Sequence, residues 1–263
     1  MGEFNYRKSL GQNFLKDVHV IDKIIESADI DSDTLVVEVG PGQGALSRSI
    51  VKNAKYAIFY EIDTRLNWYL NRLLKDYDNY HIVINDFLKE DVKEELSKHE
   101  YKKLYVLSNL PYYITTPIVS KFIDDDILPD KMILMMQKEV ANRFSASVGS
   151  KEYGALTVLL NYYYDTKKLF EVSRNCFFPK PKVESTVICM ELKKKRLKVE
   201  NMAVFKRLIK DSFRHKRKNL KNNLDDYDLH KIEKILSKYN LDLSCRAEAL
   251  SLDIFVEIAN DIL

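Results

Sequence analysis

The stretch Leu35-Val-Val-Glu-Val-Gly-Pro-Gly-Gln-Gly44 joins the pattern of a buried strand to a glycine-rich turn. Short apolar, β-branched runs of the same kind recur further along the chain and alternate with amphipathic stretches. Strands that alternate with helices predict right-handed βαβ units and a mainly parallel sheet that is covered on both faces. The strands predicted in this series are Leu35–Val39, Ala57–Tyr60, His81–Ile84, Leu104–Leu107 and Met132–Met136.

The alternation of strands and helices stops after this series. Leu156–Tyr164 and Thr186–Leu192 have strand-like composition with no helix of normal length between them, so we expect an antiparallel pair at the end of the sheet. From Lys193 onward, apolar residues keep only helical spacing. We therefore predict an α/β fold with a Rossmann-like sheet domain over residues 1–192 and a small all-helical domain over residues 193–263.

Positive charge is concentrated near the start of this helical region. The whole chain has a formal net charge of +3, but Lys193–Lys221 holds 13 Lys or Arg residues against two acids. This segment has a net charge of +11 and the remainder of the chain −8. Such asymmetry predicts a basic segment that meets a polyanion, although a solvated face of charged helices would have the same composition.

Several classes of protein are disfavoured by composition. No apolar run reaches the roughly 18 residues that a membrane-spanning helix needs, and the first residues lack the apolar stretch of a secretory signal. The chain has 3 cysteines, widely spaced, which suit neither a disulfide framework nor a zinc site. We expect a soluble, cytoplasmic protein that binds no metal.

The glycine-rich turn predicts a nucleoside site. Gly40, Gly42 and Gly44 follow the G-x-G-x-G spacing, whereas binders of a pyrophosphate use G-x-G-x-x-G. Glu61 ends the next strand, about twenty residues on, where a carboxylate can bind ribose hydroxyls. Asp86 ends the third strand and can accept hydrogen bonds from the amino group of an adenine. Two carboxylates around an adenosine without phosphates favour S-adenosylmethionine, while a dinucleotide enzyme or purely structural glycines remain alternatives.

The stretch Ser108-Asn-Leu-Pro-Tyr-Tyr113 ends the fourth strand, at the edge where open α/β sheets bind ligands. The N6 amino group of adenine is a poor nucleophile because its lone pair is delocalised into the ring. The side-chain oxygen of Asn109 and the carbonyl of Leu110 can accept hydrogen bonds from this group and return lone-pair density to nitrogen. Pro111 would fix the turn, and Tyr112 would offer a face on which the base can stack. An ordinary Asn-Pro turn is the alternative.

Five motifs in this order resemble those of the ribosomal RNA adenine dimethyltransferases of the KsgA type. The resemblance extends from about Arg7 to Phe255. The motifs are Lys8-Ser-Leu-Gly-Gln-Asn-Phe-Leu15, the Glu38–Gly44 loop, Asn109-Leu-Pro-Tyr-Tyr-Ile-Thr-Thr-Pro-Ile118, Phe177-Phe-Pro-Lys-Pro-Lys-Val-Glu-Ser185 and Arg246-Ala-Glu-Ala-Leu-Ser251.

This resemblance implies a seven-stranded methyltransferase domain with a helical C-terminal domain. It also implies dimethylation of two adjacent adenines in the 3′-terminal hairpin of 16S ribosomal RNA, during assembly of the small ribosomal subunit. The partner is then this RNA or the assembling subunit, and we expect a monomer.

The resemblance also implies roles for individual residues. Asn13 and Leu15 join Gly40, Glu61, Asp86 and Asn109 around the cofactor. Phe177 sandwiches the flipped base opposite Tyr112, although Phe177 could instead be a core aromatic. Phe87 departs from the family, which more often has a small residue there, and could reshape the adenine end of the pocket. For RNA binding we single out the basic run, namely Arg214, Lys216, Arg217 and Lys218.

Two other functions stay open at this point, and a third is disfavoured by the sequence. A resistance-type enzyme of the same superfamily would methylate 23S ribosomal RNA, but such enzymes more often have Asn-Ile-Pro-aromatic. A non-catalytic nucleic-acid-binding factor on the same fold could lose the Asn109–Tyr112 turn, which this chain keeps. A DNA adenine methyltransferase would have Asp- or Asn-Pro-Pro-aromatic and a separate target-recognition region, and neither is found.

Overall fold

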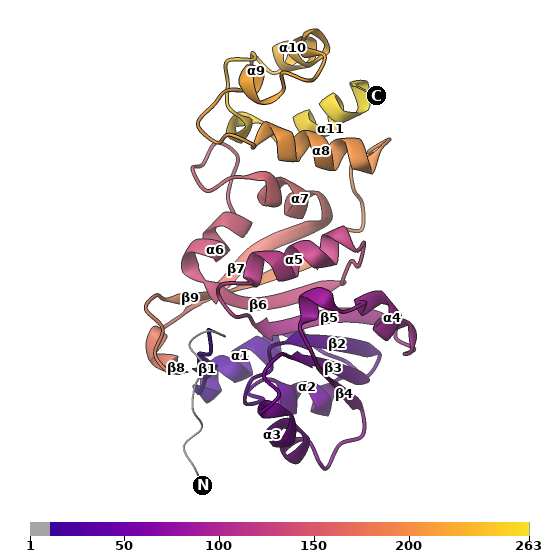
Figure 1. The fold of residues 1–263 in the computed structure, drawn as a ribbon, viewed down its shortest axis with the longest axis vertical. Helices are drawn as coiled ribbons and strands as arrows, with labels where there is room; N and C mark the ends of the chain where they lie inside the picture. Colours follow the sequence, from indigo (N-terminus) through magenta and orange to yellow (C-terminus); the bar gives the residue numbers. More distant parts are fainter. Residues whose placement is uncertain (1–10, 263) are drawn as a thin grey trace. The chain divides into compact units, whose positions relative to one another are not determined.

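The computed structural model describes residues 11–262, whose course is drawn in Figure 1. The strands are β1 (Phe14–Leu15), β2 (Thr34–Val39), β3 (Tyr56–Glu61), β4 (Tyr80–Ile84), β5 (Lys103–Asn109), β6 (Lys131–Gln137), β7 (Tyr164–Val172), β8 (Phe177–Phe178) and β9 (Ser185–Leu192). The α-helices are α1 (Val18–Ala28), α2 (Ser47–Asn53), α3 (Leu66–Leu73), α4 (Val92–Ser97), α5 (Thr115–Asp124), α6 (Lys138–Phe144), α7 (Ala155–Tyr163), α8 (Met202–Ser212), α9 (Leu220–Asn223), α10 (Leu229–Lys238) and α11 (Leu252–Asp261). Short 3-10 helices are η2 (Phe87–Lys89), η3 (Arg174–Cys176) and η4 (Ala247–Ala249).

The chain forms two compact units. One contains the residues up to Ala141 together with Lys167–Leu192, and the other contains Asn142–Thr166 and the residues from Lys193 onward. The chain enters the second unit for the last time at Lys193, the residue at which the C-terminal domain was predicted to begin. Residues 142–166, which the prediction places in the first domain, are grouped with the C-terminal helices.

The first unit is built around a seven-stranded sheet with the strand order β4-β3-β2-β5-β6-β9-β7. The strands from β4 to β6 run parallel, and β9 pairs antiparallel with β6. This sheet confirms the predicted Rossmann-like class. The order reverses between β2 and β5, because successive strands are added on one side up to β4 and on the other side from β5. In open α/β sheets such a reversal leaves a crevice at the carboxyl ends of the strands, where ligands bind.

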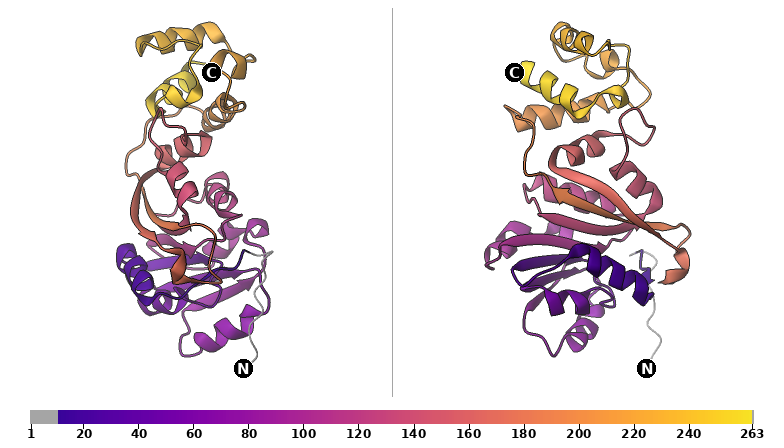
Figure 2. Two further views of the ribbon diagram at one scale, coloured as in Figure 1. Left: turned by 90° about the vertical axis from the view of Figure 1, so that its left-hand side faces the viewer. Right: turned by 180° about the vertical axis from the view of Figure 1, so that it is seen from behind.

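Helices cover both faces of this sheet (Figures 1 and 2). Ile24 of α1 and Ile50 of α2 pack in one buried cluster with Val36 and Phe59 of the central strands. Phe122 of α5 contacts the ring of Phe87, which in turn packs on Tyr60 of β3. Since neighbouring strand residues such as Phe59 and Tyr60 point to opposite faces, α5 covers the face opposite to α1 and α2.

One predicted strand is wrong. Leu156–Tyr164 was expected to be extended, but Ala155–Tyr163 is helix α7 and the strand β7 begins only at Tyr164. A short apolar run does not distinguish a buried strand from a buried helix. Here the backbone N–H of Gly154 donates to the Thr157 hydroxyl (3.2 Å), and the Val158 N–H donates to the Gly154 carbonyl (3.1 Å), which starts the helix. Tyr162 then packs against Phe205 of α8.

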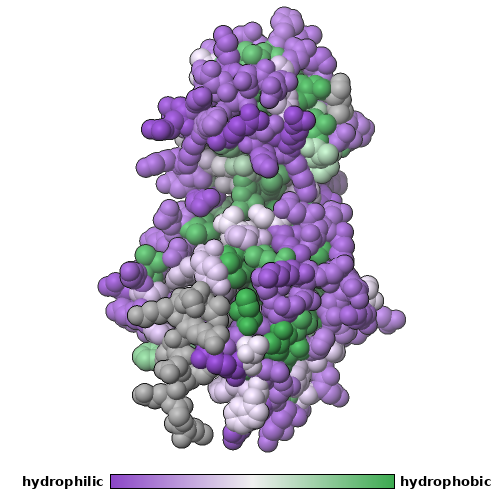
Figure 3. Space-filling view, viewed as in Figure 1, coloured by the Kyte–Doolittle hydropathy of each residue, from purple (hydrophilic) through white to green (hydrophobic). Residues whose placement is uncertain are grey.

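The second unit is helical over most of its length, as predicted for its C-terminal part. Its core is formed by apolar residues at helical spacing, including Leu208, Ile232 and Phe255, each fully buried. On the face in view, its outer surface is mainly hydrophilic (Figure 3). Such a surface fits the concentration of charge in this part of the sequence.

Candidate cofactor and adenine site

A pocket in the first unit lies at the strand-order reversal between β2 and β5. Ten of the eleven residues that were predicted for the cofactor and the adenine line it. They come from five separate parts of the chain, namely Asn13, Leu15, Gly40, Gly42, Glu61, Asp86, Asn109, Leu110, Pro111 and Tyr112. Sequence positions nearly a hundred residues apart thus meet in one cavity.

The glycine-rich turn and Glu61 form one wall of this pocket. Gly40 and Gly42 have φ angles of +72° and +58°, in the left-handed region that residues with a Cβ rarely adopt. Glu61 is only 4% exposed, and its carboxylate accepts hydrogen bonds from the backbone N–H groups of Gly42 (3.0 Å) and Asp63 (2.8 Å). Burial raises the pKa of Glu61, and these two hydrogen bonds oppose that effect. Each carboxylate oxygen keeps a second lone pair that can accept from a ribose hydroxyl.

A second buried acid, which was not among the predicted site residues, lies beside this wall. Glu38, on β2, is 2% exposed, and its carboxyl accepts a hydrogen bond from the Ser47 hydroxyl (2.6 Å). Burial raises the pKa of Glu38 to about 8, with the charge of Glu61 adding to the effect. Glu38 is therefore mostly protonated at neutral pH, whereas Glu61 is held by two backbone donors.

The end of the pocket that was predicted to hold the adenine of the cofactor contains Asp86 and Phe87. Asp86 caps η2, because its side chain accepts from the Leu88 N–H (3.1 Å). Phe87, the departure from the family, is 4% exposed and lines the same pocket. Its ring lies between those of Tyr60 (5.1 Å between centroids) and Phe122 (5.3 Å). The large residue is thus accommodated by aromatic packing below the pocket.

The turn after β5 holds the Asn109 side chain in a defined orientation. Its Nδ2 donates to the backbone carbonyl of Asn13 (3.2 Å), which leaves Oδ1 as the acceptor for a ligand. The Leu110 N–H donates to the Met135 carbonyl (3.0 Å), and this bond anchors the turn to β6. The Pro111 carbonyl accepts from the Ile114 N–H (3.1 Å) at the beginning of α5. Asn109 can therefore present its side-chain oxygen as an acceptor to an amino group.

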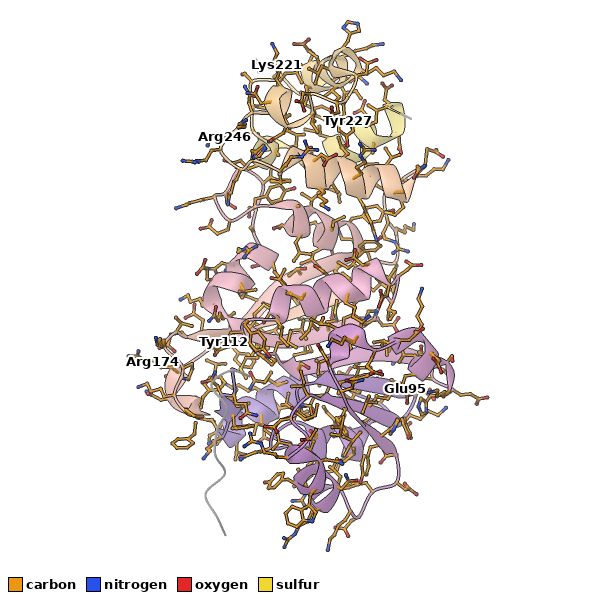
Figure 4. The ribbon with its side chains drawn as sticks, viewed as in Figure 1. Glu95, Tyr112, Arg174, Lys221, Tyr227 and Arg246 are labelled. Atoms are coloured by element: carbon orange, nitrogen blue, oxygen red, sulfur yellow. The ribbon has the colours of Figure 1, made fainter. Side chains whose placement is uncertain are left out.

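Tyr112, labelled in Figure 4, is held by its hydroxyl group. The hydroxyl shares a hydrogen bond of 2.6 Å with Ser185, the first residue of β9. Ser185 is fully buried, and burial also raises the pKa of Tyr112. The ring is thus kept neutral and fixed at the pocket, as a stacking surface requires.

Phe177 is the one predicted site residue of this group that the structure does not bring to the pocket. It is 4% exposed and packs in the same core cluster as Leu15, with which it pairs across β1 and β8. Its neighbour Phe178 is 48% exposed, and Lys16 Nζ lies 4.4 Å from the centre of its ring. The alternation of side chains along a strand sends adjacent residues to opposite faces, and here Phe177 points into the core while Phe178 points to solvent.

The four predicted RNA-binding residues lie in the second unit, in the turn after α8, and all four are exposed. Arg214 is paired with Asp211 (2.9 Å), which also accepts from the Tyr227 hydroxyl (2.8 Å; Tyr227 is labelled in Figure 4). Lys216 Nζ donates to a backbone carbonyl, that of Lys151 (2.5 Å). Among the residues that the structure describes, Arg217 and Lys218 form no salt bridge. Arg7, where the family resemblance begins, and Lys8, the first residue of the first motif, lie outside the described residues.

Residues 11–262 contain neither a candidate metal site nor a candidate membrane span. No group of three or more His, Cys, Asp or Glu side chains in this range could hold a metal ion. None of the helices in the range is long and apolar enough to cross a bilayer.

Comparison with known proteins identifies relatives over nearly the whole chain. The model of the family described as ribosomal RNA adenine dimethylase matches residues 3–262. A ribosomal RNA small subunit methyltransferase A from Staphylococcus aureus is 41% identical, and the alignment covers 97% of this chain and 89% of that protein. Among solved structures, a dimethyladenosine transferase from Plasmodium falciparum is 25% identical with a TM-score of 0.75, over 93% of this chain and 95% of its own. The 23S rRNA methyltransferase ErmE shares the fold, with a TM-score of 0.74 and 24% identity over 95% of this chain and 99% of its own.

Proposed function

Because the chain belongs to the ribosomal RNA adenine dimethylase family, we propose that it dimethylates two adjacent adenines in the 3′-terminal hairpin of 16S ribosomal RNA. It is an S-adenosylmethionine-dependent enzyme that methylates adenine N6 in ribosomal RNA. The small subunit as substrate is supported by the 41% identity to a small-subunit enzyme, against 24% to a 23S enzyme. A monomer acting in the cytoplasm, on the assembling subunit, is part of the same proposal.

The orientation of Asn109 is the observation that carries this proposal. When bound, S-adenosylmethionine supplies an activated methyl group on a sulfonium. Asn109 Oδ1 and the Leu110 carbonyl accept hydrogen bonds from the adenine amino group, which directs its lone pair away from the ring. The cofactor's methyl group would then pass to this nitrogen as its bond to sulfur breaks, and the N6 proton would leave to water. A strong general base is not needed in this sequence of steps.

Different residues of the pocket bind different parts of the cofactor. Glu61 takes the ribose hydroxyls, while the turn at Gly40 and Gly42 allows close approach of the backbone. Asp86 accepts from the adenine amino group of the cofactor, and Phe87 forms an apolar surface beside it. Since all of these residues line one cavity, the observed side chains fit the cofactor.

The decisive experiment uses small ribosomal subunits that lack the modification. Incubation with labelled cofactor, followed by nucleoside analysis of the RNA, should yield N6,N6-dimethyladenosine. The Asn109→Ala variant is the negative control. Label in 23S RNA instead of 16S RNA would favour the resistance-type activity, and binding of RNA without transfer would favour a non-catalytic factor.

The turn after α8 is the proposed RNA contact. Replacing Arg217 and Lys218 together by Ala should weaken RNA binding and reduce the slope of log affinity against log salt by roughly 0.7 to 0.9 per lost phosphate contact. Replacing Lys52 and Lys55 removes the same charge from exposed positions of the first unit and serves as the matched control. An equal change in both double variants would mean that only net charge matters.

A further inference from the structure

Residues 11–15 form part of the wall of the cofactor pocket, and they are attached to it almost residue by residue. The Asn13 side chain donates to the Gly11 carbonyl (3.0 Å), and the Asn13 carbonyl accepts from Asn109. The Phe14 ring lies directly over Gly42, where a Cβ would come within 2.7 Å of it. Leu15 pairs with Phe177. These contacts involve apolar groups or neutral hydrogen bonds.

Gln12, in contrast, contacts an ionised group. Its Nε2 donates to Oδ2 of Asp63 (2.7 Å), which lies two residues after Glu61 and is fully buried. Asp63 also forms a salt bridge with Arg65, to Oδ2 (2.5 Å), and accepts from Arg65 Nε through Oδ1 (2.8 Å). These bonds hold the pKa of Asp63 at about 2, with Arg65 as the largest cause and burial opposing it.

Asp63 is therefore a permanently charged acceptor at the junction of three parts of the site. Its backbone N–H donates to Glu61 (2.8 Å), and its side chain accepts from Gln12. Residues 11–15, which include Gln12, orient Asn109 through the carbonyl of Asn13. We propose that Asp63 is a positioning residue: through Gln12 it holds residues 11–15 over the cofactor pocket, and through Asn13 it sets the amide of Asn109. This proposal concerns the cofactor site of the family and does not depend on which ribosomal RNA is the substrate.

Gln12→Ala tests the contact directly. The variant loses the hydrogen bond to the charged Asp63, so residues 11–15 are held less firmly at the pocket. We expect the affinity for S-adenosylmethionine, measured by calorimetry, to fall by about tenfold. In the protein without cofactor, hydrogen exchange should accelerate at the Lys16 amide, which donates to the Cys176 carbonyl, and stay unchanged in β2. Affinity within about twofold of wild type would overturn the proposal.

In the Gln12→Glu variant, the affinity for the cofactor should depend on pH in a way that a merely structural role of Gln12 would not produce. While it is protonated, the introduced carboxyl group can still donate to Asp63, but once ionised it is repelled by Asp63 and releases the segment. Cofactor affinity should therefore fall as the pH rises from about 5 to about 8. Attraction between an added carboxylate and the cationic cofactor has the opposite sign, so the direction of the profile separates the two effects.

The wild-type protein and a second variant serve as controls for the titration of other charged groups around the pocket. Glu38, Glu61 and Asp86 line the same pocket, and Arg65 is paired with Asp63. Burial raises the pKa of both Glu38 and Glu61, so the wild-type profile is measured in parallel. Gln43→Glu is the matched variant, because Gln43 lines the same pocket. A flat Gln12→Glu profile, or the same fall in Gln43→Glu, would show that Asp63 does not hold the segment through Gln12.

Discussion

Glu38 and Glu61 are two buried acids in one pocket, and the structure predicts opposite results when each is replaced by Gln. Both carboxylate oxygens of Glu61 accept from backbone N–H groups, at 3.0 Å and 2.8 Å. An amide has only one acceptor oxygen, so its NH₂ group would face one of these donors. The loss should be about 1.5–3 kcal/mol of stability, as for other hydrogen bonds to charged groups. Cofactor binding should weaken by about tenfold or more, because the displaced groups belong to the pocket.

Glu38→Gln should instead stabilise the protein at neutral pH. The folded-state pKa of Glu38 is about 8, against an ordinary value of 4.5, and Gln can still accept from Ser47. Because the folded-state pKa is raised, the contribution of Glu38 to the free energy of unfolding is fully present below pH 4.5, and it is lost as the pH rises through about 8. At about 1.4 kcal/mol per pH unit, the gain in the variant at pH 7 is at most roughly 3 kcal/mol. It should vanish below the ordinary pKa of a glutamate.

Urea unfolding followed by circular dichroism at several pH values measures both variants, and calorimetry measures cofactor affinity. Wild type should lose stability between about pH 5 and about pH 8, and Glu38→Gln should lose less. The matched chemistry of the two substitutions makes each the control for the other. If Glu38→Gln were destabilised at pH 7 as much as Glu61→Gln, Glu38 would be ionised in the folded protein and the assignment above would fail.

Three further predictions concern residues that were predicted to bind the target adenine, or that contact or neighbour such residues. Asn109→Ala should leave RNA binding nearly intact and depress single-turnover methyl transfer severely, since its hydrogen bonds matter most during attack; lost RNA binding with an unchanged rate would reverse that role. Phe177→Ala should destabilise the fold by about 3–5 kcal/mol, whereas Phe178→Ala should leave the urea midpoint nearly unchanged and lower RNA affinity. An RNA effect confined to Phe177 in a folded protein would restore that residue as the stacking partner. Ser185→Ala should release the Tyr112 hydroxyl and reduce turnover without changing cofactor affinity by calorimetry, and an unchanged rate would show that Tyr112 does not need this bond.

The local sequence determined the main features of this protein. Alternating strand and helix patterns specified a parallel sheet, because periodicity reports which face of an element is buried. The Gly40–Gly44 turn, Glu61, Asp86 and the Asn109 turn each follow a strand, and parallel strands bring such positions to one edge. Their meeting in one pocket could therefore be predicted without knowing any contact.

Other features were decided only by tertiary structure. The apolar run at Ala155–Tyr163 became a helix through packing against α8, which its composition could not specify. Strand pairing with β1 chose which of Phe177 and Phe178 is buried. Gln12 and Asp63 are 51 residues apart, and neither carries a local signal beyond the position of Asp63 two residues after Glu61. Burial and the charge of an acid depend on neighbours that are distant in sequence, and for this reason only the folded chain shows that Glu38 is protonated while Asp63 is ionised.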